Sequence, residues 1–403
     1  MKILLIGEYS RLHNSLKEGL MALGHEVTIV GCGDKFKQFP VDFSIYARIC
    51  NDNKIANFLF KSIRKVIGFN LEKIEKAIRF YLLLSKLNHY QHVQLINSDA
   101  LETYPILSRF LYKKLFQNIQ SRSLLVCGDE TPIIDYLFKK EFKYSVLTPY
   151  FEDNSIEKEF QFPLKYRNDN YRKTFNWLVK NCQNLITSDL DYEIPMQKMG
   201  FQTTFIPNPI NTYKITFQNI GITDKIVIFL GINRLSYSKK GIIYFEKALE
   251  IIREKYADKI EIIVSENLPY SEYISTYNRA HILLDQVFAY DQGYNALEAM
   301  AKGKVVFTGA ETEFLNQYQL QADDVCINAE PNENEIAKKL STEVCLLDQK
   351  FIKNPDISVQ DLINELTIKV GEKIDIRRFV KFNLGEGIEK KVDDFAAEVA
   401  SMT

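Results

Sequence analysis

No stretch of this 403-residue chain approaches the roughly 18 uncharged apolar residues that a membrane-spanning helix needs. The apolar run Ile3–Ile6 near its start is also too short for the core of a secretion signal. No two of the six cysteines have Cys-x-x-Cys spacing, so we expect reduced, mostly buried thiols. A Gly-x-Gly-x-x-Gly fingerprint is absent, which argues against a dinucleotide-dependent oxidoreductase. We therefore expect a cytoplasmic protein.

The chain also has almost no net charge. Its 51 Lys and Arg residues against 52 Asp and Glu residues give −1, which argues against a nucleic-acid-binding protein. Residues 1–200 nevertheless hold 28 basic and 22 acidic side chains, while the remainder holds 23 and 30. At roughly 100–200 residues per domain, the length and this asymmetry predict at least two domains with different partners.

Alternating strands and helices predict two α/β domains in tandem. Strand Ile3–Ile6, a helix over residues 12–23 and strand Val27–Val30 form the first β-α-β unit. Further strands of this half are expected at Val93–Asn97, Leu124–Cys127, Tyr144–Thr148, Leu185–Ser188 and Thr204–Pro207. After the Pro207/Pro209 boundary, strands are expected at Ile226–Leu230, Ile260–Val264, Ile282–Asp285 and Val305–Thr308. Helical stretches are expected at 241–256, 270–280, 293–302, 357–370 and 375–400.

Ligands of parallel α/β sheets bind beyond the carboxyl ends of the strands, so the loops there are the candidate sites. The loop Gly231–Gly241 carries Arg234, Lys239 and Lys240 between two glycines. Such cations can neutralise the phosphates of a ligand, although a solvated basic loop has the same composition.

A second polar loop runs from Tyr290 to Gly303. Gly293 stands at the start of a predicted helix, whose free N–H groups favour an anion. Glu298 lies one turn further among Ala and Leu, where a carboxylate needs a partner. Sugar hydroxyls would serve, and so would a structural Lys or Arg.

These loops resemble the family 4 retaining glycosyltransferases, which have the GT-B fold. Gly293-Tyr-Asn-Ala-Leu-Glu-Ala-Met-Ala-Lys-Gly-Lys-Val-Val306 is similar to the latter part of the family's E-G-F-G-x-x-x-L-E-A-M-A-x-G-x-P-V-V segment. The cationic loop ending in Lys240-Gly241, Ile206-Pro207-Asn208 and Gly24-His25-Glu26-Val27 have counterparts in the same order. The resemblance implies two Rossmann-like parallel-sheet domains that face a cleft. It places an acceptor domain at 1–206, a nucleotide-sugar domain at 207–374 and a returning helix at 375–403.

The resemblance also implies a function: transfer of a sugar from a UDP- or GDP-sugar to a hydroxyl of a glycan or lipid-linked acceptor. The transfer would retain the anomeric configuration of the sugar and would need no metal and no cofactor. Arg234 and Lys240 (or Lys239) would stabilise the departing diphosphate, with Asp129 as a further catalytic residue. Donor-binding residues would be Gly231, Lys239, Tyr270, Tyr290, Asp291, Gly293, Tyr294, Asn295 and Glu298.

Some positions depart from the family pattern. The first Glu of the family's Glu-x7-Glu pair falls on Tyr290, so either Asp291 replaces it or the sugar is recognised differently. On the acceptor side, Gly7, Glu8 and His13 follow the first strand and are expected near the cleft. Glu8 and Asp129 have the alternative of capping helices or pairing locally. Asp189-Leu-Asp191 has metal-site spacing, but a solvated loop is favoured.

Residues 54–86 hold eight basic side chains and two acidic ones, interleaved with aromatic and aliphatic residues. A basic amphipathic helix of this kind can lie on an anionic membrane surface, here the inner face of the cell membrane. The alternative is a helix pair that packs its apolar stripe on the first sheet.

Two other functions fit the same scaffold. A nucleotide-sugar epimerase would convert the free donor without an acceptor. A non-catalytic nucleotide-sugar-binding or scaffold protein would keep the fold without the chemistry, which Tyr290 suggests.

Overall fold

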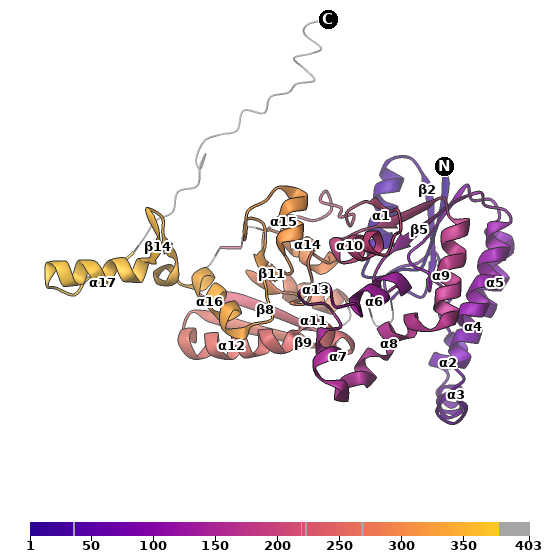
Figure 1. Ribbon diagram of the computed structural model, residues 1–403, viewed down its shortest axis with the longest axis horizontal. Helices are drawn as coiled ribbons and strands as arrows, with labels where there is room; N and C mark the ends of the chain where they lie inside the picture. The colour runs from indigo at the N-terminus through magenta and orange to yellow at the C-terminus, as the bar shows by residue number, and fades with distance from the viewer. Residues whose placement is uncertain (35–36, 219, 222–223, 267–269, 379–403) are drawn as a thin grey trace, which may run out of the picture. The chain divides into compact units, whose positions relative to one another are not determined.

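The computed structural model describes residues 1–34, 37–218, 220–221, 224–266 and 270–378, without the side chains of Ala56, Asn154, Tyr270 and Ser271 (Figure 1). Two compact units divide the chain, Met1–Val344 and Cys345–Thr403. Within its described residues, the first unit contains a seven-stranded and a five-stranded sheet. Every pair of neighbouring strands in both sheets is parallel, as the β-α-β pattern predicted.

The first sheet belongs to the amino-terminal half. Its strands lie in the order β3 (Phe43–Ser44), β2 (Glu26–Gly31), β1 (Lys2–Ile6), β4 (His92–Leu95), β5 (Ser121–Val126), β6 (Asn184–Thr187) and β7 (Thr204–Phe205). The helices of this half are α1 (Leu12–Ala22), α2 (Arg48–Asp52), α3 (Lys54–Ile67), α4 (Leu71–Leu83), α5 (Pro105–Phe116), α6 (Thr131–Leu137), α7 (Thr148–Glu152), α8 (Gln161–Leu164), α9 (Asp169–Asn181) and α10 (Leu190–Lys198).

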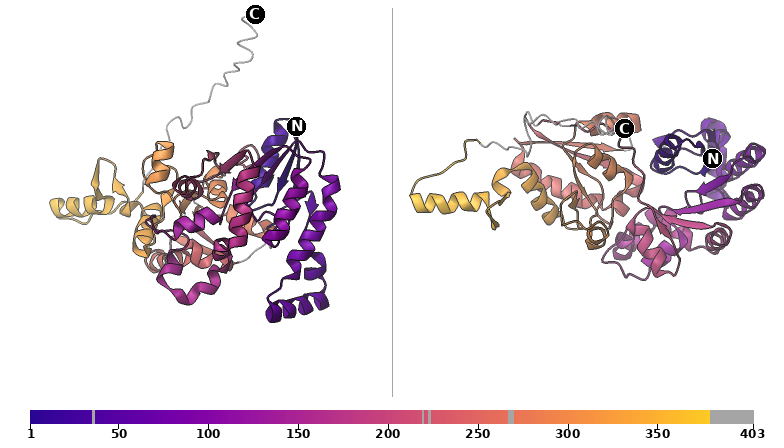
Figure 2. Two further views of the ribbon diagram at one scale, coloured as in Figure 1. Left: turned by 45° about the vertical axis from the view of Figure 1, so that its right-hand side comes forward. Right: turned by 90° about the horizontal axis from the view of Figure 1, so that it is seen from above.

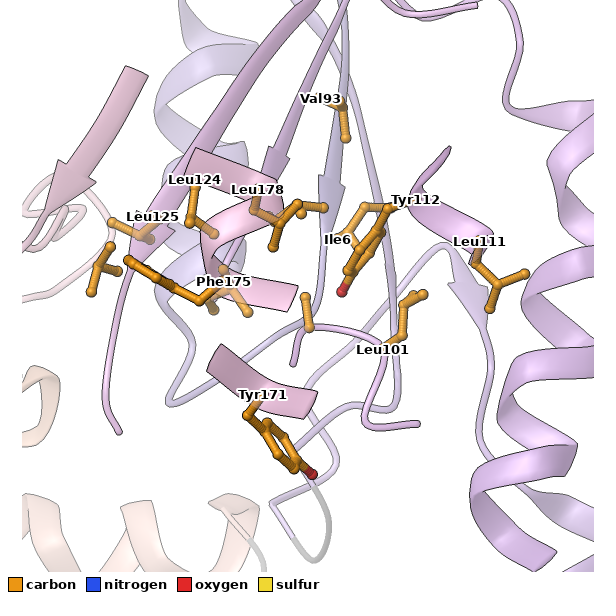
Figure 3. Packing of buried hydrophobic residues seen from close by; sticks show 14 of the residues in the cluster. Ile6, Val93, Leu101, Leu111, Tyr112, Leu124, Leu125, Tyr171, Phe175 and Leu178 are labelled. Carbon is orange, nitrogen blue, oxygen red and sulfur yellow. The ribbon is translucent and has the colours of Figure 1, made fainter. Parts of the chain in front are cut away.

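Burial of apolar strand residues against helices stabilises this half. Strands β1, β4 and β5 contribute buried side chains to one cluster with residues of α5 and α9 (Figure 3). Tyr112 lies fully buried there, and its hydroxyl donates to the Ser98 carbonyl at 3.3 Å. The bond satisfies the one polar atom that this large side chain brings into the core.

The second sheet follows the Pro207/Pro209 segment. Its strands lie in the order β12 (Ile327–Asn328), β11 (Val305–Thr308), β10 (Ile282–Leu284), β8 (Ile226–Ile232) and β9 (Ile260–Glu266). The helices of this half are α11 (Tyr237–Lys240), α12 (Ile242–Tyr256), α13 (Tyr270–Asn278), α14 (Tyr294–Ala301), α15 (Thr312–Tyr318) and α16 (Glu333–Val344). Phe229 and Leu283 are fully buried between this sheet and its helices.

Each sheet reverses its strand order at one place. The reversal lies between β1 and β4 in the first sheet and between β8 and β10 in the second. Such switch points leave a crevice outside the carboxyl ends of the strands, where α/β proteins bind ligands. The loops after β1, β4, β8 and β10 are therefore the positions at which to look for a site.

The second unit, Cys345–Thr403, is a small structure of a different kind. Strands β13 (Lys350–Phe351) and β14 (Asn354–Ser358) pair antiparallel and precede α17 (Val359–Val370). Ser358 and Asp361 cap α17 reciprocally: the Ser358 hydroxyl accepts from the Asp361 N–H, and the Asp361 carboxylate accepts from the Ser358 N–H. This capping box defines the start of the helix.

Most elements lie where the sequence predicted them, with two exceptions. The strand expected at Tyr144–Thr148 is wrong, because the Ser145 and Thr148 hydroxyls accept backbone N–H groups and form a turn before α7. Strands β3, β12, β13 and β14 were not predicted, and all but β14 are two residues long. The helix expected at 375–400 and its return to the first domain fall largely on residues outside the described ones. Residues 345–374, expected in the nucleotide-sugar domain, lie in the second unit.

No helix in the described part of the chain is long and apolar enough to span a bilayer.

Candidate functional site

A cavity of about 470 Å³ lies at the carboxyl ends of both sheets. Its walls include residues that directly follow β4, β8 and β10, which are Asn97, Asn233 and Asp285. The position agrees with the crevice expected from the two switch points. Its size is in the range of small-molecule sites. The cavity is therefore the candidate ligand site of the first unit.

Two lysines and the start of a helix meet on the wall built from the second sheet. Lys239 and Lys240 end α11, and Gly293, Tyr294 and Asn295 begin α14. All five line the cavity. Two cations together with free N–H groups at a helix start form an arrangement suited to a phosphate-bearing ligand.

A buried carboxylate holds this wall in place. The side chain of Asp285 is 1% exposed, and its Oδ1 accepts from Lys240 Nζ at 2.8 Å and from Asn295 Nδ2 at 3.0 Å. One oxygen thus connects the lysine to the first turn of α14. No role for Asp285 was predicted from the sequence, although its position directly after a buried strand at a switch point was a usable signal.

Glycine is needed at two places beside the lysines. A Cβ on Gly231 would lie 2.6 Å from a ring carbon of Tyr273, so the tyrosine packs directly on the backbone there. Gly241 has φ +66° and caps both α11 and α12, and a Cβ there would lie 2.9 Å from Val287 Cβ. The cationic loop therefore depends on glycine at both ends.

Glu298 also lines the cavity and is 6% exposed. Its Oε1 lies 3.2 Å from Lys302 Nζ one turn along α14, which matches the structural pairing that the sequence left open. Its place in the cavity wall keeps the alternative role, binding hydroxyl groups, open as well.

On the opposite wall, Asp129 follows β5 and binds Lys239. The two carboxylate oxygens lie 2.9 and 2.8 Å from Lys239 Nζ, so this ion pair joins a loop of the first sheet to α11. Tyr294 makes a second connection, since its hydroxyl is hydrogen-bonded to Ser15 of α1. Two residues expected in a donor site thus also tie the halves of the first unit together.

The loop after β1, where acceptor-side residues are expected, lies partly at the cavity. Tyr9, Ser10 and Arg11 line the cavity, whereas Gly7, Glu8 and His13 are not among its lining residues. Ser10 and Arg11 have φ of +52° and +71°, a left-handed conformation that non-glycine residues adopt at a cost. The sequence gives no local signal for this turn.

His13 has a structural environment. It is fully buried, its Nδ1 donates to the Gly7 carbonyl at 2.7 Å, and its Nε2 lies 3.2 Å from Gln94 Nε2 and accepts from it. Burial lowers the pKa of His13 to about 4, so the ring is neutral at physiological pH. Both ring nitrogens are therefore occupied by the protein.

Glu8 is also buried. Its Oε2 accepts from the Asn14 backbone N–H at 2.8 Å and from Asn14 Nδ2 at 2.6 Å, whereas Oε1 is buried with no hydrogen-bond partner among the described residues. Burial raises the pKa of Glu8 to about 7. This is the capping role that the sequence gave as an alternative.

Three predicted site residues, Arg234, Tyr290 and Asp291, lie outside the cavity wall. Arg234 is half exposed and bonded to Glu266 at 2.8 Å. Tyr290 is buried, with its hydroxyl accepting from the Lys143 N–H at 2.8 Å, and Asp291 accepts from the Leu190 N–H at 3.1 Å. Tyr270 begins α13, and its side chain lies outside what the structure describes. Lys239 and Lys240 are the cations on the wall of the second sheet, Arg11 and Lys37 line the cavity elsewhere, and Arg234 does not line it.

The solvated loop that the sequence favoured for Asp189-Leu-Asp191 is wrong, because Asp189 is buried and Asp191 is hydrogen-bonded to the second half of the first unit. Both Asp191 oxygens accept backbone N–H groups of Tyr290 and Asp291 at 3.0–3.1 Å. Burial and the neighbouring carboxylates raise the pKa of Asp189 and of Asp191. Within the described ranges, no group of three or more His, Cys, Asp or Glu side chains is placed to hold a metal ion. The motif acts as a link between the two halves.

One solved structure of a known protein shares this architecture, and others match it more weakly. Sucrose-phosphate synthase from Thermosynechococcus elongatus matches with a TM-score of 0.50 and 16% identity, over 85% of this chain and 89% of that one. Anabaena Alr3699/HepE in complex with UDP and glucose and a putative UDP-N-acetylglucosamine 2-epimerase from Listeria monocytogenes score 0.48 and 0.45, each at 11% identity and 85% coverage of this chain, with 89% and 87% of their own chains covered. The first match shows the fold alone, which is the GT-B architecture that the sequence predicted.

Curated relatives give a different result. No family model matches the chain. Elongation factor Ts of Desulforamulus reducens is 35% identical over 182 residues, which cover 39% of this chain and 82% of that protein. Over that share of its length, the chain belongs to the elongation factor Ts family. Elongation factor Ts of Carboxydothermus hydrogenoformans is 64% identical over 64 residues, 16% of this chain, and the chain spans about 30% of that relative's length.

Proposed function

We propose that the first unit, Met1–Val344, transfers a sugar from a nucleoside diphosphate sugar to a hydroxyl group of a glycan or lipid-linked acceptor. The observation that carries the proposal is the meeting of Lys239, Lys240 and the start of α14 at one cavity wall. Retention of configuration and catalysis without a metal are part of the proposal and rest on the family resemblance.

The diphosphate would lie against the two lysines. When the sugar–phosphate bond breaks, negative charge grows on the departing diphosphate, and fixed positive charge nearby lowers the energy of that transition state. Asp285 restrains Lys240 and Asn295 through hydrogen bonds of 2.8 and 3.0 Å, so these donors need little rearrangement when the ligand arrives. Asp285 is thus proposed as a positioning residue.

The nucleoside would extend towards Glu298. The ribose hydroxyls can donate to this carboxylate while Lys302 keeps its charge balanced at 3.2 Å. The acceptor would enter from the wall that carries Tyr9, Asn97 and Asp129. Asp129 is paired with Lys239, and a diphosphate bound to that lysine would free the carboxylate to accept the proton of an acceptor hydroxyl.

Donor binding tests this proposal. We expect one of UDP-, GDP-, ADP- or CMP-sugars to raise the melting temperature by roughly 5 °C at a concentration about 100 times its Kd. Lys240→Gln should weaken binding 10- to 100-fold, because it removes a charged hydrogen bond to the diphosphate. Arg234→Gln should change it far less, because that side chain lies outside the cavity wall.

The controls separate the rival functions. Asp129→Asn should strengthen donor binding, because Lys239 loses its competing partner, while abolishing transfer to an acceptor. The exposed Lys173→Gln is a matched substitution away from the cavity and should leave binding unchanged. If a sugar epimer forms from the donor in the absence of an acceptor, the proposed function is epimerisation and not glycosyl transfer. Absence of a shift with every nucleotide sugar would overturn the donor site.

We also propose that the short, highly identical matches to elongation factor Ts fall on the second unit. The unit from Cys345 to Thr403 has a length close to the 61–64 residues that several of these relatives match. The GT-B match, by contrast, covers 85% of the chain, a share similar to that of Met1–Val344. A chain made of a GT-B enzyme followed by a segment of this translation-factor family accounts for the GT-B match and for the short matches. The Desulforamulus reducens match covers 39% of this chain and therefore also includes part of Met1–Val344.

A further inference from the structure

The stretch 54–86, singled out by its charge, divides into two parts in the structure. Helix α4 packs on the protein through Ala77 and Phe80. Its basic residues Lys76 and Arg79 are bound to Glu72 and Glu75 at 2.8 and 2.7 Å, and Lys76 also binds Glu102. This part agrees with the structural alternative, because Lys76 and Arg79 of α4 have carboxylate partners within the protein.

Helix α3 differs. Phe58 is 72% exposed and Val66 is 83% exposed, and Ile55, Leu59 and Ile67 are also more than half exposed. In both Figure 1 and Figure 2, α3 lies at the end of the α2–α4 segment, away from the first sheet. Burying large apolar side chains is the main driving force of folding, so a helix that leaves five of them in water is unusual in an isolated protein.

The exposed residues are ordered around the helix. Spacings of three, four and eleven residues place Ile55, Phe58, Leu59 and Val66 on one face. The half-buried Ile63 adjoins this row, four residues after Leu59, and the half-buried Phe60 lies further round the helix. The row itself is exposed along its length and is available to a partner.

A basic row runs beside the apolar one. Lys54, Lys61 and Lys65 follow at spacings of seven and four residues, and Arg64 lies next to them. In the described part of the chain none of the four forms an ion pair, and α3 carries no acidic residue. Four cations beside an exposed apolar row are complementary to a surface that offers both hydrocarbon and negative charge.

We propose that α3 docks the protein on an anionic lipid bilayer, with its apolar row inserted at the headgroup level and its basic row on the lipid phosphates. Amphipathic helices with these two rows bind in the plane of the interface. A second copy of the chain fits less well, because two-fold pairing of α3 would bring the four cations of each copy together. The proposal is independent of the donor chemistry, because α3 contributes no residue to the cavity.

Co-sedimentation with vesicles tests it. We expect the full chain to sediment with vesicles of phosphatidylcholine and phosphatidylglycerol, less so at high salt, and only weakly with phosphatidylcholine alone. The triple variant Lys61→Glu/Arg64→Glu/Lys65→Glu should lower the partition coefficient by a factor of about 100. Phe58→Ser/Leu59→Ser should lower it by a similar factor through the apolar row.

The matched control reverses three exposed lysines elsewhere in the same half: Lys173→Glu/Lys180→Glu/Lys198→Glu. It changes the net charge equally and should leave vesicle binding intact. Melting temperatures should stay the same in all variants, because every substituted side chain is exposed. Failure of the wild type to sediment with anionic vesicles, or equal loss in the control, would overturn the proposal. So would self-association that Phe58→Ser/Leu59→Ser removes.

Discussion

At the scale of single residues, the carboxylates near the cleft differ in their hydrogen-bond and ion-pair partners. Asp285 and Asp129 are paired with lysines at 2.8 Å, whereas Glu8 is buried with only Asn14 as partner on one oxygen. An unpaired buried carboxyl favours its neutral form, which is why the pKa of Glu8 rises from 4.5 to about 7. The difference follows from partners that are distant in the sequence.

Glu8→Gln should therefore change the pH dependence of stability. Between pH 4.5 and pH 7 the unfolded Glu8 loses its proton before the folded one does, so the contribution of this group to stability falls as pH rises. Gln keeps an acceptor for Asn14 and has no charge to bury. Relative to wild type, the variant should gain about 2 kcal/mol between pH 5 and pH 8.

Thermal unfolding of both proteins at pH 5, 6, 7 and 8 measures this gain. Glu26→Gln, an exposed glutamate on β2, is the control for replacing a carboxylate by an amide. A constant difference for Glu8→Gln would mean that Glu8 is ionised in the folded protein throughout this range.

The candidate site could be predicted only where residue type and position in an element decide the outcome. Lys239, Lys240, Gly293, Asn295 and Glu298 lie at the cavity because they follow strands or begin a helix. Arg234 stands in the same loop, but its partner Glu266 belongs to β9, and a contact between two strands' ends depends on the folded sheet. Side-chain direction in a loop is not encoded locally.

At the scale of elements, the turn from α11 into α12 positions the two lysines. Gly241 caps both helices at φ +66°, and the Val287 N–H donates to the Lys240 carbonyl at 2.8 Å. The loop after β10 thus holds the backbone of the cationic loop. A side chain at residue 241 would push the loop after β10 away from the cationic loop.

Gly241→Ala should destabilise the protein by about 2–4 kcal/mol, from left-handed strain and the contact with Val287. It should also weaken donor binding, because Lys240 moves with the turn. Gly24→Ala is the matched control: its φ is +80°, but no atom lies within 4 Å of the added Cβ, so strain alone of about 1 kcal/mol is expected. Melting temperature and donor affinity of the two variants check this, and equal effects would contradict it.

Elements with strong periodicity were predictable, and those set by local hydrogen bonds were not. Buried apolar runs such as Ile226–Ile232 predicted their strands within two residues. Tyr144–Thr148 has the composition of a strand, yet its Ser and Thr hydroxyls bind backbone N–H groups and form a turn. Two-residue strands such as β3 are too short to leave a pattern.

At the scale of the whole molecule, both sheets and their cores lie in Met1–Val344. A chain ending at Val344 should therefore fold and keep its melting temperature within a few degrees. Its donor affinity should equal that of the full chain, because every residue that lines the cavity precedes residue 344. Calorimetry and donor titration of the shortened chain test this, and loss of cooperative unfolding would show that the second unit contributes to the fold.

The two-domain α/β fold was predictable at this scale because β-α-β units repeat on both sides of the prolines. The boundary at Cys345 was not predictable. A helix-rich tail has the same sequence pattern whether it packs on the preceding domain or forms its own unit.

The order of the strands has a consequence for solubility. In the described part of the chain, three of the four outer strands of the parallel sheets, β3, β7 and β12, are two residues long and offer little backbone to another molecule. The fourth, β9, has seven residues, but Glu261 and Glu266 on it are paired with Arg279 and Arg234. These charges disfavour edge-to-edge aggregation, so Arg234 protects a sheet edge.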